Sequence, residues 1–379
     1  MKVLHLFSNH KLTGPAEPVV RLAAALADRG HEVVLAHAPP PRSGDGDIVS
    51  AAQRYGVETT TEFQLPKHYR TLTILSDVRR LSGYLDENRF EVVHCHLVND
   101  HLTGALAVGR NRSPARIVRT NHEAVAMKRG LRGSFLLPRR TDALIELSRR
   151  ARRGNIERFG MPPDRVSVID TSVEMARFDP ARELPDMRAK WGLSPGHFVV
   201  GIAARIQKRR RFDVLLDAAA IARDRIPGFR LVIIGRGTHK QAVAVGPARK
   251  RGLDDIVVFP GYLRDDDYVG GLAGLDVKTF LVPGTDGSCR AAREAMALGV
   301  PLVASRRGML PELVDDGETG LVVDDTPEGL AGAFERLARD DRLRERMGSA
   351  ARQAALARFD PAEQAMRVEQ VYEDVLSER

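Results

Sequence analysis

Two carboxylates around residue 290 are spaced so that both can face one ligand. Asp286 lies in a glycine-rich loop after an expected strand at 277–281, and Glu294 lies in an expected helix at 289–298. Ser288 is a good N-cap for that helix, whose first N–H groups would favour phosphate or sugar oxygens. One carboxylate can reach a polar group at the mouth of the loop, and the other can reach a hydroxyl farther along the helix. The competing interpretation is a capped core helix with an incidental acid.

A second candidate group is a basic run that follows an expected strand at 198–203. Arg205 comes shortly after that strand, and four more basic residues follow closely: Lys208, Arg209, Arg210 and Arg211. Guanidinium groups bind phosphate oxygens through paired hydrogen bonds and stay charged, so they can stabilise a phosphorylated leaving group as a metal would. We expect no metal, because the sequence has no D-x-D motif and no convincing ligand cluster. The alternative is an exposed loop or a basic patch for RNA.

Histidines near expected strand ends are further candidates. His122 follows a strand expected at 117–121, and an ordinary histidine pKa would let it donate to a sugar hydroxyl or a phosphate, although a lone histidine is more often structural. His94 and His96 share one face of a strand, but a third metal ligand at suitable spacing is missing. Cys289 has no partner base within sequence reach, so we expect a small residue at a helix start rather than a nucleophile.

The elements that must position these residues alternate along the whole chain. Short β-rich runs separated by helical patterns, the first at 19–29 and the last at 361–376, indicate parallel sheets with helical crossovers. We therefore expect an α/β protein of two Rossmann-like, doubly wound parallel sheets, with ligands at the carboxyl ends of the strands in an interdomain cleft. The expected strands are residues 3–7, 33–38, 92–96, 117–121, 143–147, 166–169, 198–203, 230–235, 255–259, 276–281, 301–304 and 320–323.

The pattern also divides the chain into domains. A first domain is expected at 1–175 and a second at 197–359, separated by a proline-containing interdomain segment at 176–196. The last helix, within 360–379, is expected to join the first domain.

Composition supports a globular chain and excludes several classes. The 379 residues are 43% hydrophobic and 28% charged, which excludes collagen-like and broadly disordered chains. Cys95 and Cys289 are far apart in sequence, so a disulfide framework is not available and a reducing compartment fits. The apolar run at 3–7 is too short for an export signal or a membrane span, and we expect a cytoplasmic protein.

Charge is concentrated in the N-terminal half. Residues 1–183 contain 28 Lys and Arg against 21 Asp and Glu, whereas residues 184–379 contain 30 against 29. A basic face in the first half suits an anionic partner such as a membrane surface or a phosphorylated lipid. The alternative is an arginine-rich solvated surface. We expect no nucleic acid partner, because the basic residues lack aromatic interleaving or a known binding module.

Several motifs in sequence order resemble glycosyltransferase family 4, which comprises retaining enzymes of the GT-B fold. The spacing of Asp286 and Glu294 resembles the E-x₇-E donor motif of that family, and the resemblance covers nearly the whole chain in a form similar to a bacterial subset. The other landmarks are Gly14 before an amphipathic helix, VVHCHL at 92–97, RTNHE at 119–123, VIDTSVEMARF at 168–178, GIAARIQKRRRFDVLLDA at 201–218, LVIIGRG at 231–237, FPGYL at 259–263 and ELVDDGETGLVV at 312–323.

The resemblance implies a role for each candidate. Asp286 would bind sugar hydroxyls and Glu294 the nucleotide ribose. Arg205 and Arg210 would stabilise the departing diphosphate, and His122 would lie near the donor sugar. Asp286 stands where the family usually has Glu and is one methylene shorter, which leaves the sugar identity open. The other donor contacts implied are Gly14, Gly235, Arg236, Leu263, Gly287, Ser288 and Cys289.

The implied activity is metal-independent, retaining transfer of a hexose from a nucleotide sugar, with UDP favoured over GDP and no further cofactor. The acceptor would be lipid-linked or a cell-envelope polysaccharide such as lipopolysaccharide, at the cytoplasmic membrane face. A different GT-B enzyme, such as an epimerase or a phosphorylase, is disfavoured by the D-x₇-E spacing. The contacts expected with membrane or acceptor are Lys128, Arg129, Arg132, Arg139 and Arg140.

Two departures from the family pattern favour another alternative. Gly14 is followed by Pro15 where the family has tandem glycines, and Thr171 and Ser172 stand where it has Asn-Gly. Proline removes an N–H, and only glycine tolerates positive φ freely. The alternative is therefore a catalytically degenerate GT-B binding or scaffold protein in a glycan-assembly complex.

Overall fold

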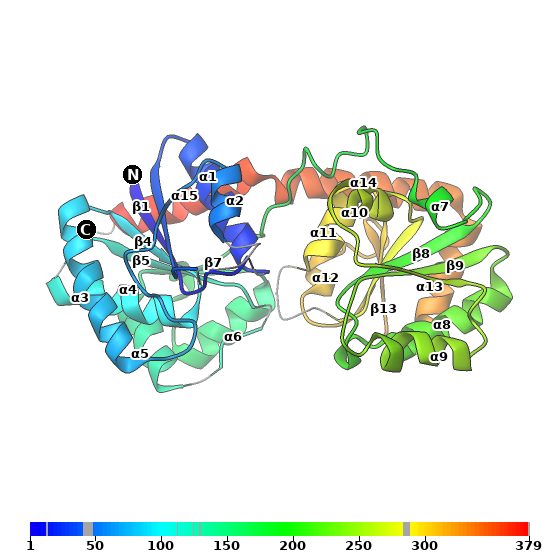
Figure 1. The fold of residues 1–379 in the computed structure, drawn as a ribbon, viewed down its shortest axis with the longest axis horizontal. Helices are drawn as coiled ribbons and strands as arrows, with labels where there is room; N and C mark the ends of the chain where they lie inside the picture. Colours follow the sequence, from blue (N-terminus) through cyan, green and yellow to red (C-terminus); the bar gives the residue numbers. More distant parts are fainter. Residues whose placement is uncertain are drawn as a thin grey trace. The chain divides into compact units, whose positions relative to one another are not determined.

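The computed structural model describes residues 1–12, 14–40, 48–111, 113–123, 125–128, 130–282 and 289–377. These residues form two compact units. The first consists of residues 1–172 and 361–377, and the second of residues 173–282 and 289–360. The colours of Figure 1 show how the chain leaves the first unit, builds the second and returns with its last helix, α15 (Pro361–Ser377), to complete the first.

The first unit is built on a parallel sheet in the order β3-β2-β1-β4-β5-β6-β7. Side chains of alternate strand positions enter two apolar clusters, one with helices α1, α2 and α15 and the other with α3 and α4. The strands are β1 (Lys2–Phe7), β2 (Glu32–His37), β3 (Glu58–Thr60), β4 (Val92–Cys95), β5 (Arg116–Asn121), β6 (Ala143–Glu146) and β7 (Val166–Val168). The helices are α1 (Ala16–Asp28), α2 (Ile48–Arg54), α3 (Thr71–Asn88), α4 (Val98–Asn111), α5 (Leu131–Arg140) and α6 (Arg149–Phe159), with a short 3₁₀ turn at Pro163–Arg165.

The second unit repeats this plan with the strand order β10-β9-β8-β11-β12-β13. Its largest apolar cluster joins the sheet to helices α8 and α13. The strands are β8 (Phe198–Ala203), β9 (Phe229–Ile234), β10 (Val257–Gly261), β11 (Val277–Phe280), β12 (Leu302–Ser305) and β13 (Gly320–Val323). The helices are α7 (Met187–Lys190), α8 (Phe212–Arg225), α9 (Gly246–Lys250), α10 (Asp265–Ala273), α11 (Arg290–Ala297), α12 (Leu310–Leu313), α13 (Pro327–Arg339) and α14 (Asp341–Phe359), with short turns at Lys208–Arg210 (3₁₀) and Gln241–Val245 (π).

Every strand pairing in both sheets is parallel. The expected α/β class with two doubly wound parallel sheets is thus confirmed. Parallel strands are buried on both faces, which explains why strands such as β8 read as continuous apolar runs. Gly30 follows α1 with φ +87°, the left-handed conformation that ends helices.

The structure also differs from the sequence expectations in places. The pattern gave no elements between 39 and 91, where α2, β3 and α3 lie; β3 has three residues, too few to show alternation. Residues 176–196, expected between the domains, fold with the second unit and contain α7. Ion pairs hold this segment to the start of α10, from Arg182 to Asp266 at 3.1 Å and from Lys190 to Asp267 at 2.8 Å.

Candidate active site

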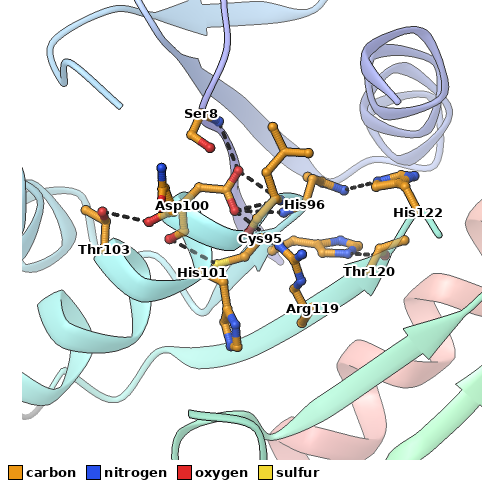
Figure 2. A network of polar contacts seen from close by, with 12 residues as sticks. Ser8, Cys95, His96, Asp100, His101, Thr103, Arg119, Thr120 and His122 are labelled. Carbon is orange, nitrogen blue, oxygen red and sulfur yellow. Dashed lines mark hydrogen bonds and ion pairs between the residues drawn. The ribbon is translucent and has the colours of Figure 1, made fainter. Parts of the chain in front are cut away.

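The carboxyl edge of the first sheet carries a buried polar network around Asp100, in the first turn of α4. Its carboxylate accepts backbone N–H bonds from Ser8 at 2.9 Å, His96 at 3.1 Å and Leu97 at 2.8 Å. The Arg119 guanidinium lies 3.4 Å from Asp100 and also donates to the Leu97 carbonyl. Burial raises the pKa of Asp100 to about 6, against the opposing effects of Arg119 and these N–H groups. Figure 2 shows that Asp100 joins segments following different strands.

His122, which directly follows β5, lies at this same edge. Its Nε2 is 3.1 Å from Nδ1 of His96, and Figure 2 shows the two rings pointing toward each other. A small cavity of about 10 Å³ adjoins them, lined also by Thr120 and Thr171. The expected near-neutral pKa of His122 is wrong, because burial and the nearby Arg119 charge lower it to about 3. His122 is therefore a neutral hydrogen-bonding group rather than a proton-charged one.

A third histidine, His5 of β1, joins His94 and His96, so that ligand-type nitrogens of all three lie within 4.8 Å of one another. The spacing of His94 and His96 could not show this third member, because His5 comes 91 positions before His96 in the sequence. The rings of His94 and His96 are stacked with centroids 4.3 Å apart, and those of His5 and His96 at 5.1 Å. Both nitrogens of His94 and both of His96 are engaged in hydrogen bonds, to Tyr372, Thr120, His5 and His122. In this structure the three histidines form a buried, hydrogen-bonded cluster.

Glu146, at the end of β6, is a buried acid that sequence analysis missed. It accepts from the side-chain amides of Asn121 at 2.9 Å and Asn155 at 2.5 Å. Burial raises its pKa to about 7 despite those donors. The amide oxygens of both asparagines accept backbone N–H groups, from Glu123 and Met127, so the two asparagines hold the loop after His122 against α6.

The basic residues expected to touch membrane or acceptor separate in the structure. Arg139 and Arg140, in the last turn of α5, line a pocket of about 500 Å³ with Arg116 and Arg165. Arg116 begins β5 and Arg165 precedes β7, so this pocket lies at the amino edge of the sheet, opposite the edge that carries His122. The exposed Lys128 does not line it, and Arg129 and the side chain of Arg132 lie outside the described residues.

In the second unit, Gly235 and Gly237 bring the chain after β9 against the loop after β8. A Cβ at Gly235 would lie 2.0 Å from the Ala204 carbonyl oxygen, and one at Gly237 would lie 2.0 Å from that of Ile206. Between them, Arg236 places its guanidinium 4.4 Å from the ring of Tyr262, which precedes the half-buried Leu263. These glycines allow backbone approach at the carboxyl edge, and Tyr262 offers an exposed aromatic face.

The basic run after β8 divides by environment. Arg205 is exposed, while the half-buried Arg210 donates to the carbonyl of Val282, the last described residue before position 283, at 2.7 Å. Arg211 adopts a left-handed backbone with φ +57° and pairs with Asp325 at 2.9 Å. Arg205 and Arg210 thus remain at the carboxyl edge as proposed phosphate contacts, whereas Arg211 links the start of α8 to the segment after β13.

Around α11, the described part of the expected donor motif is buried. Glu294 accepts from the Tyr268 hydroxyl at 2.6 Å and lies 3.6 Å from Arg290. Cys289 is buried and has a left-handed φ of +45°, so it precedes the helix as a small residue. Three donor candidates, Asp286, Gly287 and Ser288, lie outside the described residues. Gly14, the donor candidate of the first unit, forms the turn before Pro15 and α1.

Lys278 of β11 is a further charged residue that sequence analysis missed. Its side chain is fully buried, and Nζ donates to the Thr279 carbonyl at 2.8 Å. Burial lowers its pKa to about 7, and the Arg210 charge acts in the same direction while Glu294 opposes it.

Comparisons with known proteins agree with this architecture. The family described as "Glycosyltransferase Family 4" matches residues 14–177, and the family described as "Glycosyl transferases group 1" matches residues 184–354. The D-inositol 3-phosphate glycosyltransferase of Nocardia farcinica is 29% identical over 80% of this chain and 72% of its own. The protein of that name from Acidothermus cellulolyticus is 29% identical over 95% of this chain and 85% of its own.

A solved structure shows the same fold. Anabaena Alr3699/HepE in complex with UDP superposes with a TM-score of 0.79 at 18% identity, over 99% of this chain and 100% of that one. Two wholly parallel Rossmann-like units with these matches define a glycosyltransferase of the GT-B type. The chain belongs to glycosyltransferase family 4. Among the helices that the structure describes, none is both long and apolar enough to cross a bilayer.

Proposed function

We propose that the protein transfers a hexose from a UDP-sugar to a lipid-linked or polysaccharide acceptor, with retention of configuration and without a metal ion. The observation that carries this proposal is the group at the carboxyl edge of the second sheet. Arg205 follows β8, Arg210 donates to the carbonyl of Val282, four residues before Asp286, and Gly235 and Gly237 let the backbone approach closely. Guanidinium groups at such an edge can stabilise a departing diphosphate.

We assign donor binding to the second unit and acceptor binding to the first. The second would bind the nucleotide diphosphate, with Glu294 receiving the ribose hydroxyls and Asp286 the sugar. The first would bind the acceptor, and neutral His122 would hydrogen-bond a substrate oxygen. The name of the relatives from Nocardia and Acidothermus adds inositol phosphate to the acceptors that deserve testing. The Anabaena neighbour was solved in complex with UDP, which supports a UDP-sugar over a GDP-sugar as the donor.

A calorimetric titration with UDP, GDP, ADP, dTDP and their common sugars tests the donor. We expect UDP to bind, and Arg205→Ala and Glu294→Ala each to weaken that binding at least about tenfold, the loss of one charged hydrogen bond. Arg209→Ala is the matched control, because Arg209 is exposed and bonds only to nearby Gln207 among the described residues. Equal binding by all four proteins would contradict the proposed site.

Turnover tests the chemistry. We expect hydrolysis of the bound UDP-sugar without acceptor, unchanged by EDTA, and an anomeric configuration retained in the transfer product by NMR. The acceptors tested should include short-chain lipid-linked sugars, glycan fragments and inositol phosphate. Donor binding without hydrolysis or transfer with any acceptor would favour the catalytically degenerate scaffold. The Gly14-Pro15 and Thr171-Ser172 departures from the family pattern are the reason for that alternative.

A further inference from the structure

Three imidazoles in the first unit form a continuous hydrogen-bonded chain. His122 Nε2 lies 3.1 Å from His96 Nδ1, and His96 Nε2 lies 2.9 Å from His5 Nδ1. His5 belongs to β1, His96 directly follows β4, and His122 directly follows β5, so the chain crosses three neighbouring strands of the sheet. Figure 2 shows its outer link, from His96 to His122.

The protons of these rings are coupled. All three rings are neutral near pH 7, because burial lowers the pKa of His5 and His122 to about 3 and that of His96 well below its usual value. A neutral imidazole has one N–H donor and one lone-pair acceptor, and each link of the chain needs one of each. The three protons must therefore all lie on Nδ1 or all on Nε2.

The ends of the chain distinguish these two states. His5 Nε2 is buried and has no hydrogen-bond partner among the described residues. Protons on Nε2 would therefore leave a buried N–H of His5 without an acceptor, whereas protons on Nδ1 leave a bare lone pair there. Orphaned buried N–H groups are rarer than unsatisfied acceptors, which favours Nδ1. His122, 9% exposed, then carries an N–H on Nδ1, an atom that bonds to no described residue.

We propose that His5 and His96 are positioning residues that hold His122 in its Nδ1-protonated tautomer, so that His122 donates an N–H to an oxygen of its ligand. The ligand oxygen, of a sugar hydroxyl or a phosphate, rests on the proposed function; the tautomer does not. His94, stacked beside the chain, is not part of it, because its nitrogens bond to the Tyr372 and Thr120 hydroxyls at 2.6 and 2.7 Å.

Two-bond ¹⁵N–¹H correlation spectra of the full chain, labelled in histidine and without ligand, report which ring nitrogen carries each proton. We expect His122 to be protonated on Nδ1 in the wild type. His96→Leu removes the donor to His122 Nε2, so a resolved population with the proton on Nε2 should appear. His96→Asn should restore the wild-type signal, because its side-chain amide can donate to the same atom.

His101→Leu is the matched control for loss of a buried histidine. His101 is 5% exposed and bonds to the Thr141 hydroxyl at 2.9 Å, so it is not part of the hydrogen-bonded row of His5, His96 and His122. We therefore expect His122 to keep its tautomer in this variant. The inference is overturned if wild-type His122 carries its proton on Nε2. It is equally overturned if folded His96→Leu leaves the tautomer unchanged.

Donor hydrolysis provides the functional arm. We expect His96→Leu to lower the turnover of the UDP-sugar about tenfold and His96→Asn to recover most of it, the effect of one correctly directed hydrogen bond. If the wild type hydrolyses no nucleotide sugar, the proposed function fails, while the spectra still decide the inference. A tautomer that shifts in His96→Leu without any change in turnover would overturn the ligand contact.

Discussion

Lys278 shows how a single residue can oppose stability in this fold. Its amine is enclosed in the second sheet, with the Thr279 carbonyl as its hydrogen-bond acceptor and the Phe280 ring 5.1 Å away. Desolvation penalises the charged form, so the pKa is lowered to about 7. The unfolded chain binds this proton between about pH 7 and 10.5, whereas the folded chain does not. Stability should therefore rise with pH across that window.

Lys278→Met tests this sign. Methionine fills a similar volume without a charge, so we expect it to stabilise the second unit at pH 7 by on the order of 3 kcal/mol. The gain should shrink as the pH rises from 7 and vanish above about 10.5, where the wild-type amine is neutral in both the folded and the unfolded state. Urea unfolding followed by the fluorescence of Trp191, the single tryptophan of the chain, reports this unit. A difference between the two proteins that is constant with pH would contradict the expectation.

At the scale of elements, the turn after β9 depends on glycine. Gly235 has φ +147°, and both it and Gly237 lie against carbonyl oxygens of the loop after β8. A hydrogen bond from Ile206 N to the Arg236 carbonyl at 3.0 Å fixes the same contact. Close backbone approach thus shapes the region that we propose binds the diphosphate.

Gly235→Ala should therefore destabilise the second unit by at least about 2 kcal/mol, because the new Cβ overlaps the Ala204 oxygen and φ is unfavourable. Gly332→Ala is the matched control. Gly332 lies inside α13 with no atom within 4 Å of an added Cβ, and this change should stabilise by up to about 1 kcal/mol. The midpoint of the Trp191 transition measures both. Equal effects of the two substitutions would refute the role given to the turn.

At the scale of the whole molecule, the first unit is discontinuous in sequence. Its last element, α15, contributes buried Ala365, Val368 and Tyr372 to the core shared with α1. The Tyr372 hydroxyl also bonds to His94 within the sheet. The first unit therefore becomes complete only after the second has been synthesised.

A chain ending at residue 360 should lose the folded first unit and keep the second. Exposing several apolar side chains, each worth about 1.5–3 kcal/mol, removes an amount comparable with the whole stability of a domain. The backbone amides of β1 and β4 should lose their protection from hydrogen exchange. The midpoint of the unfolding transition reported by Trp191 should stay unchanged. A peptide of residues 361–377 added in trans should restore protection. Protected β1 amides in the truncated chain would contradict this view.

The fold class and the order of the strands along the chain could be read from the amino-acid sequence alone. Parallel strands buried on both faces must read as short apolar runs, so β8 and β13 were predicted with their observed bounds. Local motifs, being contiguous, likewise predicted where His122, Arg205 and Glu294 lie relative to their strands and helices. Ranges with weak periodicity, such as β3, escaped prediction because three residues carry too little pattern.

The environments of the buried polar residues depend on the tertiary structure. His5 and His96 meet because β1 and β4 are neighbours in the sheet, although 91 residues separate them in sequence. The buried states of Asp100, Glu146 and Lys278, and hence their shifted pKa values, depend on what packs around them rather than on adjacent residues. Arg139 and Arg140 likewise follow His122 closely in sequence yet lie at the opposite sheet edge. Desolvation and cross-strand hydrogen bonding are properties of packing, and packing is not encoded in local spacing.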